Sequence, residues 1–196
     1  MTPRIAQASR TTKETRIEVS INLDGSGESQ IDTGLGFLDH MLDALARHSG
    51  IDITLSCAGD LVIDDHHSVE DCALVLGKAI DEAMGDRAGI ARFASAYAPL
   101  DEALARVVID LSGRPFASVE LGFVREMLGQ VATENITHFF ESLATTMRAT
   151  LHVDLIRGRN DHHKAEAAFK ALALALRDAT RITRGDAMPS TKGTLS

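Results

Sequence analysis

The 196-residue sequence contains no tryptophan and only 4% aromatic residues, although hydrophobic residues make up 44% of the chain. Leucine, isoleucine, valine and alanine must therefore fill the core of what is otherwise an ordinary globular composition. No apolar run approaches the ~18–20 residues of a membrane-spanning helix, so we expect no membrane partner. No basic run occurs and the formal net charge is −8, which argues against a nucleic-acid partner.

Cysteine is also scarce: Cys57 and Cys72 are the only two, and both lie in apolar surroundings. We expect both to be buried free thiols. Neither lies beside a histidine pair, which excludes a zinc-finger arrangement. The first residues, Met-Thr-Pro-Arg, carry no apolar signal core, so we expect a cytoplasmic protein.

What the sequence does contain is a repeated group of metal-ligand side chains. The pattern Asp-His-His-x-x-Glu occupies residues 65–70 and again residues 161–166. Adjacent histidines point about 100° apart on a helix and cannot share one apolar contact, so packing does not explain them. Upstream of each copy, residues 38–46 resemble residues 136–144. We interpret the chain as an internal duplication.

The duplication pairs His40 with His138, so each half carries one histidine on an earlier helix and His-His-x-x-Glu on a later helix. Gly85–Gly89 is the expected joint between the halves. The first structural repeat then covers residues 1–90 and the second covers residues 91–196.

Hydrophobic periodicity predicts the same order of elements in both halves, an α+β architecture in which helices cover one face of each small sheet. In the first half we expect strands over 16–23 and 28–33, joined as a hairpin by a turn at 24–27, then a helix over 37–48, a strand over 51–57 and a helix over 66–84. In the second half we expect strands over 106–111 and 116–121, a helix over 134–149, a strand over 151–156 and a helix over 161–182.

Helical geometry limits which ligands can share an ion. His66 and Glu70 are four residues apart and lie on one helix face, whereas His67 points away. His162 and Glu166 repeat this arrangement, with His163 turned away. We therefore expect two metal sites that share ligands across the duplication and lie at a subunit boundary: His66, Glu70, His163 and His138 for one, and His162, Glu166, His67 and His40 for the other.

Three imidazoles and one carboxylate without sulfur suit Mn, Fe, Co or Zn. Four protein ligands on an octahedral ion leave positions open, which indicates a catalytic site. A ferritin-like store is disfavoured because ferritin-type sites use Glu-x-x-His on long bundle helices, and this chain has strands between its helices. His48 and His152 have no counterpart in the other half, so each is expected to be a surface histidine or a buried histidine with its hydrogen bonds satisfied.

The chain resembles the monofunctional imidazoleglycerol-phosphate dehydratases of histidine biosynthesis over essentially its whole length. The resemblance rests on both Asp-His-His-x-x-Glu copies and on three further segments, Arg-Thr-Thr-Lys-Glu-Thr (10–15), Gly-Phe-Leu-Asp-His-Met-Leu (36–42) and Pro-Ser-Thr-Lys-Gly (189–193). It implies a tandem pair of ribosomal protein S5 domain 2-like units. It also implies two Mn(II) ions per active site and a 24-subunit shell whose sites are completed by neighbouring subunits.

The reaction that the resemblance implies is dehydration of D-erythro-1-(imidazol-4-yl)glycerol 3-phosphate to 3-(imidazol-4-yl)-2-oxopropyl phosphate. The proton to be removed has no adjacent carbonyl, so the substrate imidazole must act as the electron sink, which divalent ions on its nitrogens favour. The family pattern gives the acid/base role to Glu14, and the substrate-binding role, chiefly toward the phosphate, to Glu14, Arg92, Arg114, Lys170, Ser190 and Lys192.

Two of these positions have support from the residues themselves. Ser190–Gly193 is a short segment of the anion-binding type. Lys170 lies two turns along a helix from the His162–His163 pair and projects toward the same site.

Two other functions remain open from the residues alone. A dinuclear metallohydrolase would bridge a water between its metals instead of binding an azole. A non-catalytic metal-binding shell would have no use for Glu14 or for the Lys192 segment.

Overall fold

The computed structural model describes residues 3–183, 187–191, 193 and 195. Each half of the chain forms one four-stranded sheet. The first has the order β1-β2-β4-β3 and consists of β1 (Ile5–Thr11), β2 (Thr15–Asn22), β4 (Asp52–Gly59) and β3 (Ser29–Asp32). The second has the order β5-β6-β10-β7 and consists of β5 (Phe93–Leu100), β6 (Ala103–Asp110), β10 (Thr150–Arg157) and β7 (Phe116–Glu120).

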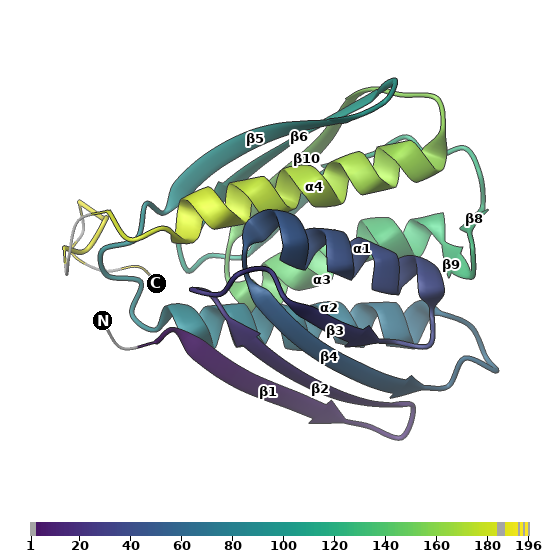
Figure 1. Ribbon diagram of the computed structural model, residues 1–196, viewed down its shortest axis with the longest axis horizontal. Helices are drawn as coiled ribbons and strands as arrows, with labels where there is room; N and C mark the ends of the chain where they lie inside the picture. Colours follow the sequence, from purple (N-terminus) through teal and green to yellow (C-terminus); the bar gives the residue numbers. More distant parts are fainter. Residues whose placement is uncertain (1–2, 184–186, 192, 194, 196) are drawn as a thin grey trace.

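Four helices lie between the two sheets, so that each sheet is covered on one face, as predicted (Figure 1). They are α1 (Gly36–Ser49), α2 (His66–Met84), α3 (Thr133–Met147) and α4 (Asp161–Thr180). Helix α2 packs on β1 and β2, and α4 packs on β5 and β6. Helix α1 packs against α4 and α2 packs against α3, so the helices of the two halves share one core. A short hairpin, β8 (Met127–Leu128) with β9 (Val131–Ala132), precedes α3.

The predicted partner of the second strand was wrong. The segment 28–33 was expected to form a hairpin with strand 16–23, but β3 instead pairs in parallel with β4. The carboxylate of Asp52 accepts hydrogen bonds from the backbone N–H groups of Ser26, Gly27 and Glu28 at 2.8–3.0 Å, which holds the connection beside β4. The partner of β2 on its other side is β1, an antiparallel strand that the periodicity did not indicate. In the second half β5 was missed in the same way, and β7 pairs in parallel with β10.

The core is aliphatic apart from one aromatic cluster. Phe139, Phe140 and Phe169 are fully buried, with ring centroids 4.9–6.0 Å apart. Cys72 is a buried free thiol, as expected, whereas the free thiol of Cys57 is only partly buried.

Asp52 provides a stability prediction. Burial would raise the pKa of its carboxyl, but the hydrogen bonds from the Ser26, Glu28 and Gly27 N–H groups and from Asn22 outweigh it, and the pKa is lowered. A depressed folded-state pKa stabilises the fold above the unfolded-state pKa of ~3.9, and this contribution is lost as the pH falls through the folded value. Asp52→Ala should therefore lower the free energy of unfolding by ~1–3 kcal/mol at neutral pH and by less at pH 2–3. Urea unfolding at both pH values measures this, and an equal loss at both would contradict it.

Gly77 lies where α2 crosses α3. A Cβ atom at this position would lie 2.6 Å from the Leu143 carbonyl oxygen and 3.0 Å from the Met147 nitrogen. Because both atoms belong to backbone, the helices would have to move apart, and Gly77→Ala should cost ~1–3 kcal/mol of stability. Gly36→Ala is the matched control, since a Cβ there meets nothing within 4 Å. Thermal unfolding of both variants tests the prediction, which fails if Gly77→Ala is as stable as Gly36→Ala.

Candidate metal centres

The N-terminal ends of all four helices lie at one end of the molecule, together with the β1–β2 and β5–β6 turns (Figure 1). This end carries the repeated motifs, because α2 begins at His66 and α4 begins at Asp161. The aspartates that open the motifs are buried and brace the segment before α3: Asp65 accepts from the Ala132 N–H, and Asp161 from the N–H groups of Val124 and Arg125. Because the N-terminal ends of the helices lie together, the six histidines of the candidate sites gather at this end (Figure 1).

The first cluster joins His66 and Glu70 of α2 to His138 of α3. The Nε2 atom of His138 lies 3.2 Å from Oε1 of Glu70, and Nε2 of His66 lies 3.9 Å from Oε2. The two imidazole rings stack with centroids 5.2 Å apart. His138 belongs to the second repeat, and the packing of α3 on α2 brings it to Glu70 of the first repeat.

The second cluster repeats this arrangement with the halves exchanged. His162 and Glu166 of α4 meet His40 of α1. Oε2 of Glu166 lies 3.1 Å from Nε2 of His40 and 3.2 Å from Nε2 of His162. The structure therefore brings together His138 with Glu70 and His40 with Glu166, the grouping expected from the sequence.

The donor sets fit a first-row divalent ion. Two atoms that are each bonded at ~2.1 Å to one ion lie ~3–4 Å apart, and the nitrogen–oxygen distances of 3.1–3.9 Å in both clusters match this spacing. Two imidazoles and a carboxylate are typical ligands of Mn, Fe, Co or Zn, and three protein ligands leave room for further ones.

The second cluster carries an additional cation. Lys170 lies one turn beyond Glu166, and its Nζ is 2.6 Å from Oε1 of Glu166. Burial would raise the pKa of Glu166, but Lys170 and His40 outweigh that effect and lower it to about 2. Glu166 is therefore ionised at any physiological pH, as a metal ligand requires.

His67 and His163 do not join the cluster of their own helix. Nδ1 of His67 lies 3.1 Å from the Asp60 carboxylate, and Nδ1 of His163 lies 2.7 Å from Oε2 of Glu102. These hydrogen bonds raise the pKa of both histidines. Their Nε2 atoms point elsewhere, that of His67 toward Oε2 of Glu14 at 3.9 Å.

Glu14 occupies the turn between β1 and β2, and its side chain is half exposed. The Thr12 hydroxyl accepts the backbone N–H of Glu14 and that of Thr15. The Thr15 hydroxyl donates to buried Asp71, which also pairs with Arg10 at 2.8 Å. The turn is thus fastened to α2 one residue after Glu70, which places Glu14 beside the histidines although it is distant from them in sequence.

Three other residues expected to bind substrate, Arg92, Arg114 and Ser190, lie at the opposite end of the molecule. The backbone N–H of Arg92 donates to the Ala179 carbonyl, which places Arg92 at the C-terminal end of α4. Its guanidinium pairs with Asp110 at 2.7 Å and donates to the Pro189 carbonyl, beside Ser190. A depression of about 550 Å³ is lined here by Ala91, Arg92, Phe93, Met188, Pro189, Ser190 and Thr191.

Arg114 belongs to the same end, since its carbonyl accepts from Thr150, directly after α3. Lys192 lies outside the described residues. Helix α4 has 20 residues and is therefore ~30 Å long. Arg92 and His162, at its two ends, cannot contact one small substrate within a single chain.

Sequence reasoning missed the residues that hold the histidines. Besides Asp60 and Glu102, these include Asn135, whose Oδ1 lies 2.9 Å from Nδ1 of His66. It also missed Asp71, which fastens the Glu14 turn. Asp60 lies in the connection after β4 and Glu102 in the turn between β5 and β6, where an acidic residue gives no local signal of such a role. His48 and His152 are both exposed, in agreement with the expectation of surface histidines.

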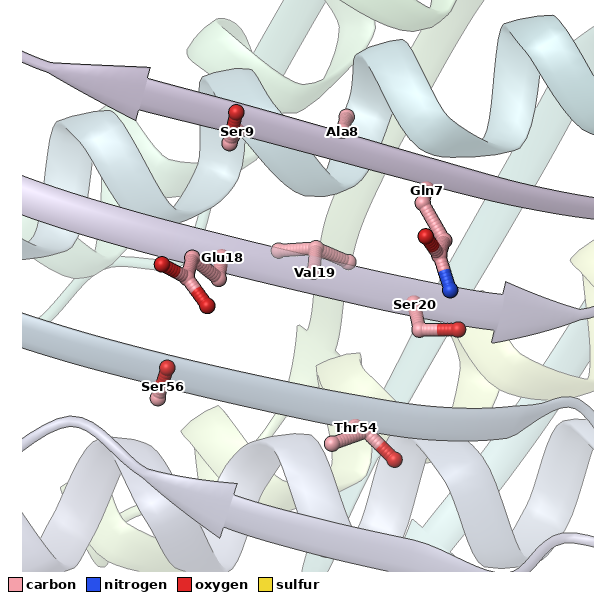
Figure 2. Close-up of a pocket in the computed structure, with 8 residues that line it drawn as sticks. All are labelled: Gln7, Ala8, Ser9, Glu18, Val19, Ser20, Thr54 and Ser56. Atoms are coloured by element: carbon pink, nitrogen blue, oxygen red, sulfur yellow. The ribbon is translucent and has the colours of Figure 1, made fainter.

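A further concavity lies away from the clusters. It measures about 520 Å³ and covers the outer face of the first sheet, where Gln7, Ser9, Glu18, Ser20, Thr54 and Ser56 lie along β1, β2 and β4 (Figure 2). Its small polar side chains include none of the histidines, so the metal centres remain the candidate site.

Comparison with known proteins identifies the family. The imidazoleglycerol-phosphate dehydratase family matches residues 33–176. The chain is 58% identical over 193 residues to an imidazoleglycerol-phosphate dehydratase of Phytophthora nicotianae, covering 98% of this chain and 43% of that protein. It is 54% identical over 195 residues to the enzyme of Methanothermobacter thermautotrophicus, covering 100% of both. The crystal structure of the enzyme from Staphylococcus aureus superposes with a TM-score of 0.83 at 41% identity, covering 91% of this chain and 99% of that one. The chain belongs to the imidazoleglycerol-phosphate dehydratase family of lyases.

Proposed function

We propose that this protein dehydrates D-erythro-1-(imidazol-4-yl)glycerol 3-phosphate to 3-(imidazol-4-yl)-2-oxopropyl phosphate, as a step of histidine biosynthesis, with two Mn(II) ions in each active site. The observation that carries the proposal is the pair of His-Glu-His clusters, each built from both repeats. The family relationship supplies the substrate class. In the described residues no helix is long and apolar enough to span a membrane, and we propose a cytoplasmic location.

The ligands of one ion would be His66, Glu70, His138 and His163, and those of the other would be His40, His162, Glu166 and His67. His67 and His163 face away from the cluster of their own helix, so we propose that each serves a cluster in a neighbouring subunit. Bound divalent ions would polarise the substrate imidazole and make it an electron sink.

The residues of this chain would then move the protons. The Glu14 carboxylate, which lies beside His67, would take the proton from the glycerol carbon next to the carbinol. Loss of the hydroxyl as water leaves an enol, and return of a proton to the carbon next to the imidazole gives the ketone. A carboxylate that can hold and release a proton serves both steps.

The phosphate would be bound by Arg92, Arg114, Ser190, Lys192 and Lys170. Because the first three lie a helix length from the histidines of the same chain, a complete site requires another subunit. This separation supports assembly into a closed shell, which we propose to contain 24 subunits.

Turnover of imidazoleglycerol phosphate by metal-free protein, before and after addition of Mn(II), tests the function. We expect activity only with the ion, and a particle in light scattering that is many times the mass of one chain. A protein that binds Mn(II) in both clusters but leaves this substrate unchanged would contradict the proposal.

A further inference from the structure

His67 and His163 are each held by a carboxylate, and the two carboxylates come from non-equivalent places in the two repeats. Asp60, in the connection after β4, accepts from Nδ1 of His67 through both oxygens at 3.1–3.2 Å. Glu102, in the turn between β5 and β6, accepts from Nδ1 of His163 at 2.7 Å. A carboxylate can only accept, so each ring carries its proton on Nδ1 and offers the Nε2 lone pair.

Glu102 is the counterpart of Glu14 in the duplicated fold. Glu14 directly precedes β2 and Glu102 directly precedes β6, the second strand of each hairpin. Oε1 of Glu102 also accepts the backbone N–H groups of Arg159 and Asn160 at 2.8–3.0 Å, so both of its oxygens are engaged. Glu14 differs from Glu102 in this respect: Asp60 contacts Nδ1 of His67, and Glu14 faces Nε2 of the same ring.

Resting on the function proposed above, we infer that Asp60 and Glu102 are positioning residues that fix the Nε2-coordinating form of His67 and His163. Outer carboxylates of this kind orient a ligand ring and strengthen it as a donor. A fixed ring orientation matters most for these two histidines, because neither joins the His-Glu-His cluster on its own helix.

The two carboxylates respond differently to amide substitution. In Glu102→Gln the oxygen can stay on the Arg159 and Asn160 N–H groups, which turns the amide NH₂ toward His163 and favours the wrong ring tautomer. Asp60 contacts His67 with both oxygens, so Asp60→Asn can still present an oxygen, whereas Asp60→Ala cannot.

The test is titration of chelator-treated, full-length protein with Mn(II), with free Mn(II) followed by electron paramagnetic resonance. We expect Glu102→Gln and Asp60→Ala to weaken binding of one ion by ~10–100-fold, and Asp60→Asn to bind nearly as the wild type does. Glu28→Gln, an exposed carboxylate before β3, is the matched control. Turnover of Asp60→Ala should recover at saturating Mn(II), because Glu14 remains.

The inference is overturned if Glu102→Gln and Asp60→Ala bind both ions as tightly as Glu28→Gln does. It is also overturned if Mn(II) saturation leaves Asp60→Ala inactive while metal-free thermal unfolding shows it folded. Failure of the wild type to bind Mn(II) or to turn over the substrate would instead contradict the proposed function.

Discussion

Glu14→Gln is expected to lower turnover by ~10²–10⁴-fold, the contribution that general acid/base groups make, while Mn(II) content and particle size stay as in the wild type. The amide keeps the size and the backbone contacts of the Glu14 turn, since Thr12 and Asp71 bind the backbone and Thr15 rather than this side chain. It loses only the ability to take up a proton. Metal analysis and turnover on the same sample are the deciding measurements.

Glu18→Gln is the matched control for this variant. Glu18 is an exposed carboxylate on the same hairpin, and it lies on the outer face of the first sheet, away from the histidines (Figure 2). We expect the Glu18→Gln variant to retain full turnover. Wild-type turnover in Glu14→Gln would remove Glu14 from the mechanism, and loss of metal from that variant would make it a ligand.

The parts of the fold that the sequence predicted are those governed by local periodicity. The helix expected over 66–84 is α2 itself, because its apolar residues recur at helical spacing and a glycine follows it. Strand β1 was missed because Ala8 is its one buried side chain, so no alternation of apolar residues marks it. Strand β5 resembles it, with small alanines facing inward and Pro99 near its end.

The same distinction applies to the candidate site. His66 with Glu70 and His162 with Glu166 are helical neighbours, so spacing alone groups them. The contribution of His138 and His40 depends on helix packing across the repeats, and the duplication was enough to indicate it. Asp60 and Glu102 reach their histidines only through tertiary structure, so the sequence could not predict these contacts. The distance of Arg92 from the histidines follows from the packing of its segment at the far end of α4, which the sequence did not predict either.

Glu70→Gln is expected to release one of the two ions and to abolish turnover, while the second ion stays bound. Each oxygen of Glu70 faces a different histidine, His138 and His66, so the neutral amide removes the one anionic ligand of that cluster. Affinity at this site should fall by at least ~100-fold. Equilibrium dialysis against Mn(II) should then give about half of the wild-type content.

Glu166→Gln is the matched change in the other cluster, and the two variants should not behave alike. Lys170 pairs with Glu166 at 2.6 Å, whereas Leu74 occupies the position four residues after Glu70. Once Glu166 is neutral, the Lys170 ammonium lies beside an uncompensated cation site and repels the ion. We therefore expect Glu166→Gln to lose its ion more completely than Glu70→Gln does, and Glu166→Gln with Lys170→Met to recover part of the difference. If the two single variants bind Mn(II) equally, Lys170 has no electrostatic influence on the second ion and the two centres are equivalent.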